Sequence, residues 1–174
     1  MSGLEILAIV GIIGFVIFQQ VVGQKVRGKR LIVLPAVLTV IGYLDLYHAK
    51  GLHHADYVWL AVGAAGSLAI GLAFGVITRV RSRDGVLWAQ VPAWGLLLWV
   101  GLFAFRVLVM VLAGHTGAHV AASTTPLLFT LGLNRLGQAA VIAARAMAAG
   151  IPFAPEKDGS TFLGGGFGDR MARR

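Results

Sequence analysis

The sequence has no cysteine among its 174 residues. That absence excludes disulfide exchange, thiolate metal sites and covalent haem attachment through a C-x-x-C-H motif. Charged side chains are also scarce: Asp, Glu, Lys and Arg make up 13% of the chain, about half their share in a typical soluble domain. Neither a phosphate-binding loop ending in Gly-Lys-Ser/Thr nor a nucleophile-elbow motif occurs. The sequence therefore carries no familiar enzyme signature.

Apolar residues, in contrast, are abundant. They form 57% of the chain, whereas soluble domains contain about 45–50%. A soluble protein of this length could not bury that much apolar surface in its core. The apolar residues also gather in runs of about 20, the length that crosses the hydrocarbon layer of a bilayer. The sequence therefore predicts an all-α, polytopic bundle of membrane-spanning helices.

We expect about five spanning helices from these runs. The runs cover 4–22, 31–47, 57–78, 92–112 and 126–148. No basic residue precedes the first run, Glu5 lies near its start, and a basic cluster follows it. We therefore interpret the run as a permanent helix and not as a cleaved signal peptide. Residues 1–148 would then form the membrane domain. Residues 149–174, rich in Gly and basic residues, are expected to form a cytoplasmic tail without regular structure.

The segment RVRSRDGVLWAQ separates the third and fourth runs. Its Asp84-Gly85 pair is the strongest short signal for a two-residue hairpin turn, because both residues accept positive φ. We therefore expect a short cytoplasmic β-hairpin here. The residues expected to share one of its faces are Val80, Ser82, Val86 and Trp88. The alternative is a plain loop, with the fourth helix starting at Val86.

The distribution of Lys and Arg predicts the orientation. If the loop after the first run is cytoplasmic, most basic residues lie inside and only Lys50 lies outside. The N-terminus is then outside and the C-terminus is in the cytoplasm. The net charge of +8 is therefore a signal of topology and does not indicate nucleic-acid binding. We expect a bacterial cytoplasmic membrane, with its anionic inner leaflet, as the partner of these basic ends.

Small residues recur every four positions along the third run, at Gly63, Ser67, Gly71 and Gly75. Such a ladder lets a neighbouring helix backbone approach closely. Two interpretations are open at this point. The ladder packs inside the bundle, or it forms the face that meets a second copy or another membrane protein.

Two arginines fall within spans, where ionisable residues are functional candidates by default. Arg106 lies about 9 Å from the outer end of the fourth run, at 1.5 Å per residue, and Asp45 lies at a similar depth on the second. We expect an Arg106–Asp45 ion pair. The alternative is an anionic ligand held by Arg106 near the outer leaflet.

Arg135 lies close to the bilayer midplane, where the sequence offers no acid at the same depth. Its polar neighbours are Asn134 and Gln138. Three interpretations are open. Arg135 lines a wet cavity or ligand site, it bonds to carbonyls and side chains, or the fifth helix breaks at Gly137 and leaves Arg135 at the inner surface.

All the histidines are predicted on the outer side. They are His48, His53, His54, His115 and His119. His115 and His119 would share a face if their segment were helical. Neutral imidazoles at that spacing suit Zn, Cu or haem iron. The alternative is that these histidines are solvated loop residues.

Several features follow one another in a set order along residues 1–148. They are the basic stretch ending in Lys29-Arg30, Leu34-Pro35 opening the second run, Gly71 and Gly75, the segment RVRSRDGVLW, Arg106 and Arg135. In this order the chain resembles the CcdC-like family of small bacterial membrane proteins, whose name associates it with cytochrome c biogenesis. The resemblance implies an accessory role, for example in haem handling, and brings no catalytic residues. The alanine-rich fifth run and the outer histidines depart from the pattern.

Three classes of function follow. The favoured one is a non-enzymatic accessory protein, because few residues could act as a general acid or base and small helix-packing residues are frequent. The alternative is a component that binds or transports haem, a divalent metal or an anionic lipid, using Arg106, Arg135 and the outer histidines. An intramembrane enzyme is the third class, and it has no visible nucleophile–base set.

Overall fold

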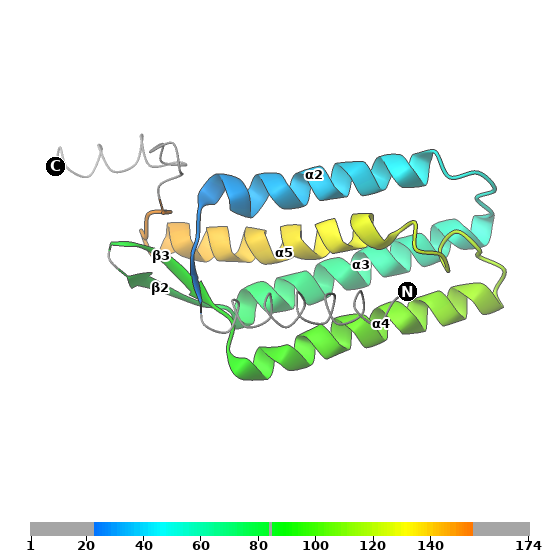
Figure 1. Cartoon of the computed structure of the whole chain (residues 1–174). Helices are drawn as coiled ribbons and strands as arrows, with labels where there is room; N and C mark the ends of the chain where they lie inside the picture. The colour runs from blue at the N-terminus through cyan, green and yellow to red at the C-terminus, as the bar shows by residue number, and fades with distance from the viewer. Residues whose placement is uncertain (1–22, 84, 155–174) are drawn as a thin grey trace, which may run out of the picture.

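The computed structural model describes residues 23–83 and 85–154, which form a helical bundle with a small sheet at one end (Figure 1). The helices are α2 (Gly28–Tyr47), α3 (His54–Ile77), α4 (Leu96–His115) and α5 (Leu127–Ala148), and a 3-10 turn, η1 (Ala93–Gly95), precedes α4. The strands are β1 (Gln24–Lys25), β2 (Arg79–Arg83) and β3 (Val86–Gln90).

Within the described residues, 4 helices are long and apolar enough to cross a membrane. They correspond to the second to fifth predicted runs, so the count is one fewer than the five expected. The first predicted run, 4–22, lies outside the described residues. The described helices α2, α3, α4 and α5 lie side by side along a common direction (Figure 1), as expected for a bundle that spans a bilayer.

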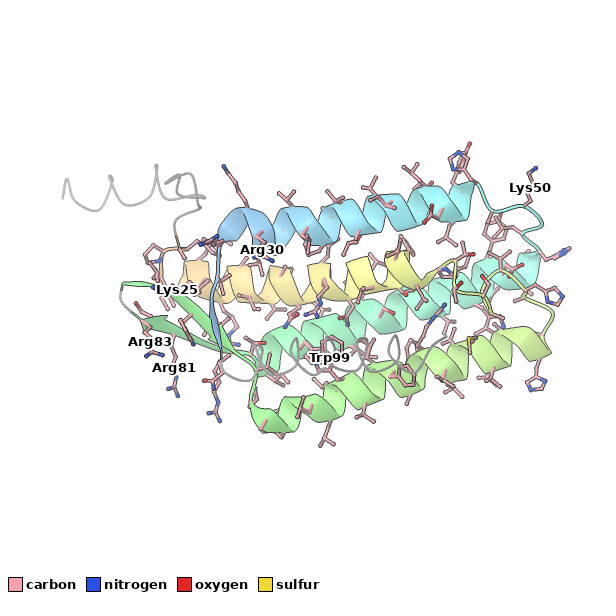
Figure 2. All side chains as sticks on the ribbon, viewed as in Figure 1. Lys25, Arg30, Lys50, Arg81, Arg83 and Trp99 are labelled. Atoms are coloured by element: carbon pink, nitrogen blue, oxygen red, sulfur yellow. The ribbon has the colours of Figure 1, made fainter. Side chains whose placement is uncertain are left out.

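The basic residues labelled in Figure 2 lie mostly at one end of the bundle. Figure 2 places Lys25, Arg30, Arg81 and Arg83 at the sheet end and Lys50 at the opposite end. Following the orientation expected from the Lys and Arg distribution, we name the sheet end the cytoplasmic end and the opposite end the outer end.

The predicted hairpin is present, but its faces differ from the prediction. β2 and β3 are antiparallel, with Arg83 opposite Val86 and Ser82 opposite Leu87, and Gly85 in the turn has a φ of 73°. Directly opposed residues in an antiparallel pair point to the same side. Ser82 therefore shares a face with Leu87, whereas Val86 shares one with Arg83. The expected grouping of Val80 and Ser82 with Val86 and Trp88 is wrong, because a two-residue turn pairs even-numbered with odd-numbered positions.

The sheet is held against the cytoplasmic end of α5. Its strand order is β1–β3–β2, so β3 is the central strand. Leu87 on β3 is completely buried and packs with Ile142 and Ala146 of α5 and with Phe153. This contact fixes the sheet to the bundle through one face only.

The chain beyond α5 also joins this core. The Leu87 N–H donates to the Pro152 carbonyl at 2.9 Å, and the Ala154 N–H donates to the Val26 carbonyl at 2.9 Å. Phe153 between them is buried. The ordered domain therefore continues to Ala154, beyond the boundary expected at 148. Residues 155–174 of the expected tail lie outside the described residues.

The small-residue ladder on α3 packs against α5, which favours internal packing over an intermolecular face. A methyl group at Gly71 would collide with the backbone of Asn134. At Gly75 it would meet the Gln138 carbonyl oxygen at 3.0 Å. The facing helix α5 has a glycine at the same contact, Gly137, where a methyl group would come within 2.9 Å of the Leu68 carbonyl oxygen. The two backbones therefore approach too closely for side chains at these positions.

Replacing Gly71 by alanine tests this close approach. Because the added methyl group meets backbone that cannot move aside alone, we expect Gly71→Ala to destabilise the protein by about 1–3 kcal/mol. Gly101→Ala on α4 is the matched control, since nothing lies within 4 Å of its added methyl group and alanine favours helix by up to about 1 kcal/mol. Thermal unfolding in detergent measures both. Equal stability of the two variants would contradict the packing described here.

Candidate functional site

Polar side chains within the spans gather at two levels of the bundle. The central polar group lies at mid-height between α3 and α5 and consists of Ser67, Asn134, Arg135 and Gln138. The outer cap lies at the outer end and consists of the loop 116–126 with Asp56 and Arg106.

Asn134 ties α5 to α3 in the middle of the bundle. It is buried, and its Nδ2 donates to the Ser67 carbonyl oxygen at 3.0 Å. The adjacent Gly71 allows the backbones to come close enough for this bond. In an apolar surrounding, an unpaired amide would be costly. Within the described residues no buried side-chain nitrogen or oxygen lacks a hydrogen-bond partner. The buried polar atoms of the central polar group therefore all have hydrogen-bond partners.

Arg135 points from α5 toward α4. Its Nη1 donates to Gln138 Oε1 at 2.9 Å, and its guanidinium lies 5.0 Å from the ring centroid of Trp99. A cation over an indole face is attracted by the ring quadrupole. α5 runs unbroken from Leu127 to Ala148, which excludes the third interpretation, a helix break at Gly137. Of the three interpretations, bonding to neighbouring side chains is the one that the described contacts favour.

Asp56 anchors the outer cap. Its carboxylate is completely buried in the first turn of α3 and accepts hydrogen bonds from the Ala121 N–H at 2.9 Å and the His53 N–H at 3.0 Å. The bond to Ala121 holds the loop between α4 and α5 over the end of α3. Trp59 adds a second tie, because its Nε1 donates to Thr116 Oγ1 at 2.7 Å.

Arg106 completes the outer cap and does not pair with Asp45. Its Nη2 donates to the Ser123 carbonyl oxygen at 2.9 Å, while Asp45 is exposed. The expected ion pair is wrong because α2 packs on α5, whereas α4 packs on α3. α2 and α4 lie on opposite sides of the bundle in Figure 1. Equal depth in the membrane did not bring the two side chains together.

The five histidines lie at the outer end, as predicted, and all are exposed. α4 ends at His115, and His119 lies in the following turn, so these two do not share a helical face. Among residues 23–83 and 85–154, no three metal-ligating side chains converge.

Arg145 has a role that the sequence interpretation missed. Its Nη1 donates to three carbonyl oxygens at the end of α3, those of Gly75 at 3.1 Å, Val76 at 2.9 Å and Thr78 at 2.7 Å. The last carbonyls of a helix have no partner within it and form the negative end of its dipole. The sequence does show that Arg145 lies near the cytoplasmic end of the fifth run, but this position indicates only the membrane orientation and not the contact with the end of α3.

Asp56 was missed in a similar way, since its depth alone was considered. The three-residue spacing from His53 to Asp56 is that of a capping box, in which the acid accepts the N-cap N–H. That pattern could have located the start of α3. Nothing in the sequence indicated that the same carboxylate would also reach Ala121, 65 positions away.

The chain matches no family model, no curated protein and no solved structure.

Asp56 offers a direct test of the outer cap. In Asp56→Asn one acceptor oxygen becomes an NH₂ group that faces a backbone donor, so we expect a loss of about 1–3 kcal/mol in stability and faster proteolysis within 116–126. Asp45→Asn, at an exposed position, is the control, and it should change stability by less than about 0.5 kcal/mol. Thermal unfolding and limited proteolysis in detergent measure both effects. An Asp56→Asn protein as stable and as protease-resistant as Asp45→Asn would contradict the anchoring role.

Proposed function

We propose that this chain is a non-enzymatic accessory protein of the cytoplasmic membrane, which acts by binding another membrane protein. One observation carries the proposal. The polar side chains of the described spans bond mainly to backbone groups of neighbouring segments, and they are not arranged as acid–base or nucleophile–base pairs.

The individual contacts support this interpretation. Asn134 bonds to the Ser67 carbonyl, Arg106 bonds to the Ser123 carbonyl, and Asp56 accepts the Ala121 N–H. The Ser123 hydroxyl donates to the Val120 carbonyl at 2.7 Å and so is not activated by a base. Covalent and acid–base catalysis both need a reactive group within hydrogen-bond reach of its base. Side chains engaged in holding helices and loops together suit a scaffold.

The resemblance to the CcdC-like family points to the same class of role, associated by name with cytochrome c biogenesis. Since the chain has no cysteine, it could not exchange thiols with an apocytochrome. Under this proposal it would assist the proteins that handle haem or thiols and would not carry out their chemistry.

Photo-crosslinking in the native membrane tests the accessory role. A photoreactive phenylalanine analogue replaces Phe103, which is 73% exposed on α4, and in the control it replaces Phe74, which is 3% exposed. We expect a specific protein adduct from exposed positions on α2 or α4, and that protein should co-purify with the tagged chain at a fixed ratio in mild detergent. Phe74 should give no such adduct. Lipid adducts alone from every exposed position, together with a chain that purifies by itself, would contradict the proposal.

A second candidate function is the binding of an anionic ligand by Arg135. The observation that favours it is the position of the guanidinium, about 12 Å into α5 at 1.5 Å per residue. Its contacts among the described residues are neutral, namely Gln138 and Trp99. Gln138 takes only one of the several N–H donors of a guanidinium. A phosphate or carboxylate group, such as that of a lipid or a haem propionate, would neutralise the positive charge of Arg135 and accept hydrogen bonds from its remaining N–H donors.

Arg135→Gln and Arg135→Lys separate the two candidates. If Arg135 binds an anion, the amount of anionic amphiphile that co-purifies with the protein should fall about tenfold in Arg135→Gln, equivalent to ~1.4 kcal/mol. Arg135→Lys, which keeps the positive charge, should retain part of it. Mass spectrometry of extracted lipids and the Soret region of the absorption spectrum provide the measurement. An unchanged set of bound molecules in Arg135→Gln would exclude this second candidate and leave the accessory proposal unaffected.

A further inference from the structure

One face of the three-stranded sheet carries a row of cations. Arg79, Arg81 and Arg83 alternate along β2 and so point to the same side. Trp88 lies opposite Arg81 on β3 and opposite Lys25 on β1, which places Lys25 on that side as well. All four basic residues are exposed. We call this surface, made of Lys25, Arg79, Arg81, Arg83 and Trp88, the basic face.

The basic face points away from the bundle. The opposite face of the sheet carries Val80 and Leu87, which pack on Ile142 and Ala146 of α5. The basic face is directed sideways from the bundle and not along its axis (Figure 2). Figure 2 shows Arg81 and Arg83 extending from β2 on the side away from α5 and α2.

The depth of the sheet places this face at the membrane surface. β2 begins directly after Thr78, the C-cap of α3, and Val91 and Pro92 alone separate β3 from η1. From Arg79 to Arg83 the strand rises about 13 Å, at about 3.3 Å per residue. The headgroup layer of one leaflet is about 5–8 Å thick. If Arg79 lies at the start of this layer, Arg81 lies within it about 7 Å further along, and Arg83 extends beyond it toward the cytoplasm.

We propose that the basic face binds the phosphate groups of anionic lipids in the cytoplasmic leaflet and fixes the sheet to that leaflet. A sideways-facing surface at headgroup depth meets lipid before it meets a soluble molecule. Guanidinium groups bind phosphate oxygens in pairs of parallel hydrogen bonds. Trp88 suits the same layer, because indole rings prefer the membrane interface, and the Arg83 guanidinium lies 5.0 Å from its ring centroid. This site does not depend on the accessory role.

The absence of cysteine allows a matched pair of probes. Val86→Cys places a label on the basic face, and Ser82→Cys places one on the opposite face at nearly the same height, since Ser82 is paired with the neighbouring Leu87. Each variant carries a fluorophore and is reconstituted in phosphatidylglycerol-containing vesicles with a headgroup-labelled nitroxide lipid. We expect quenching at V86C to exceed that at S82C by about twofold or more. Equal quenching at the two sites, or a V86C label open to aqueous quenchers only, would overturn the proposal and indicate a soluble partner.

Charge variants then test the chemistry with the V86C probe. The triple change Arg79→Gln, Arg81→Gln and Arg83→Gln should abolish the excess quenching in anionic over phosphatidylcholine vesicles, and the corresponding triple change to Lys should retain most of it. Millimolar inorganic phosphate should not displace the lipid, and displacement by it would refute the lipid as the source. If the triple Gln protein does not fold, a salt titration of the labelled V86C protein, with all arginines present, tests the same electrostatic contribution to lipid binding. Quenching must weaken as ionic strength rises, and salt-independent quenching would overturn the proposal.

Discussion

The close approach of α3 and α5 is the contact on which the rest of the structure depends. In hydrocarbon no water is available to satisfy a backbone or side-chain polar group, so each must find a partner within the protein. Gly71 brings the backbones together, and Asn134 then reaches the Ser67 carbonyl. At the cytoplasmic end, Arg145 satisfies the last carbonyls of α3. These contacts align the two helices over most of their length.

α5 carries the features needed by the second candidate function, anion binding at Arg135, and by the proposed lipid binding at the basic face. Its middle presents Arg135 toward Trp99 of α4, while its last turns support the sheet through Ile142 and Ala146. The sheet in turn packs on α5 through one face, so the arginines of β2 lie on the face turned away from the bundle. The helix that organises the interior therefore also sets the direction of the charged surface. An accessory protein anchored in this way would present its exposed helices to a partner at a defined depth.

Depth along the membrane normal could be predicted from the sequence, because apolar run length and Lys/Arg position report it directly. The second to fifth apolar helices and the common end at which the histidines lie were predicted in this way, whereas the hairpin was predicted from the turn chemistry of Asp84-Gly85. The rotation of each helix and the choice of neighbours could not, since neither changes the depth of a residue. Arg106 and Asp45 lie at similar depths on helices that do not pack together. For the same reason, nothing in the sequence linked Arg145 to the end of α3 or Phe153 to Leu87.

Labelling of single cysteines in intact cells tests the central claim, that the bundle crosses the cytoplasmic membrane with its sheet inside. Lys50→Cys lies in the loop between α2 and α3, and Arg83→Cys lies at the end of β2. A membrane-impermeant maleimide should label Lys50→Cys in intact spheroplasts, and it should label Arg83→Cys only after lysis. Labelling of Arg83→Cys without lysis, or recovery of the protein in the high-speed supernatant in the absence of detergent, would contradict the account.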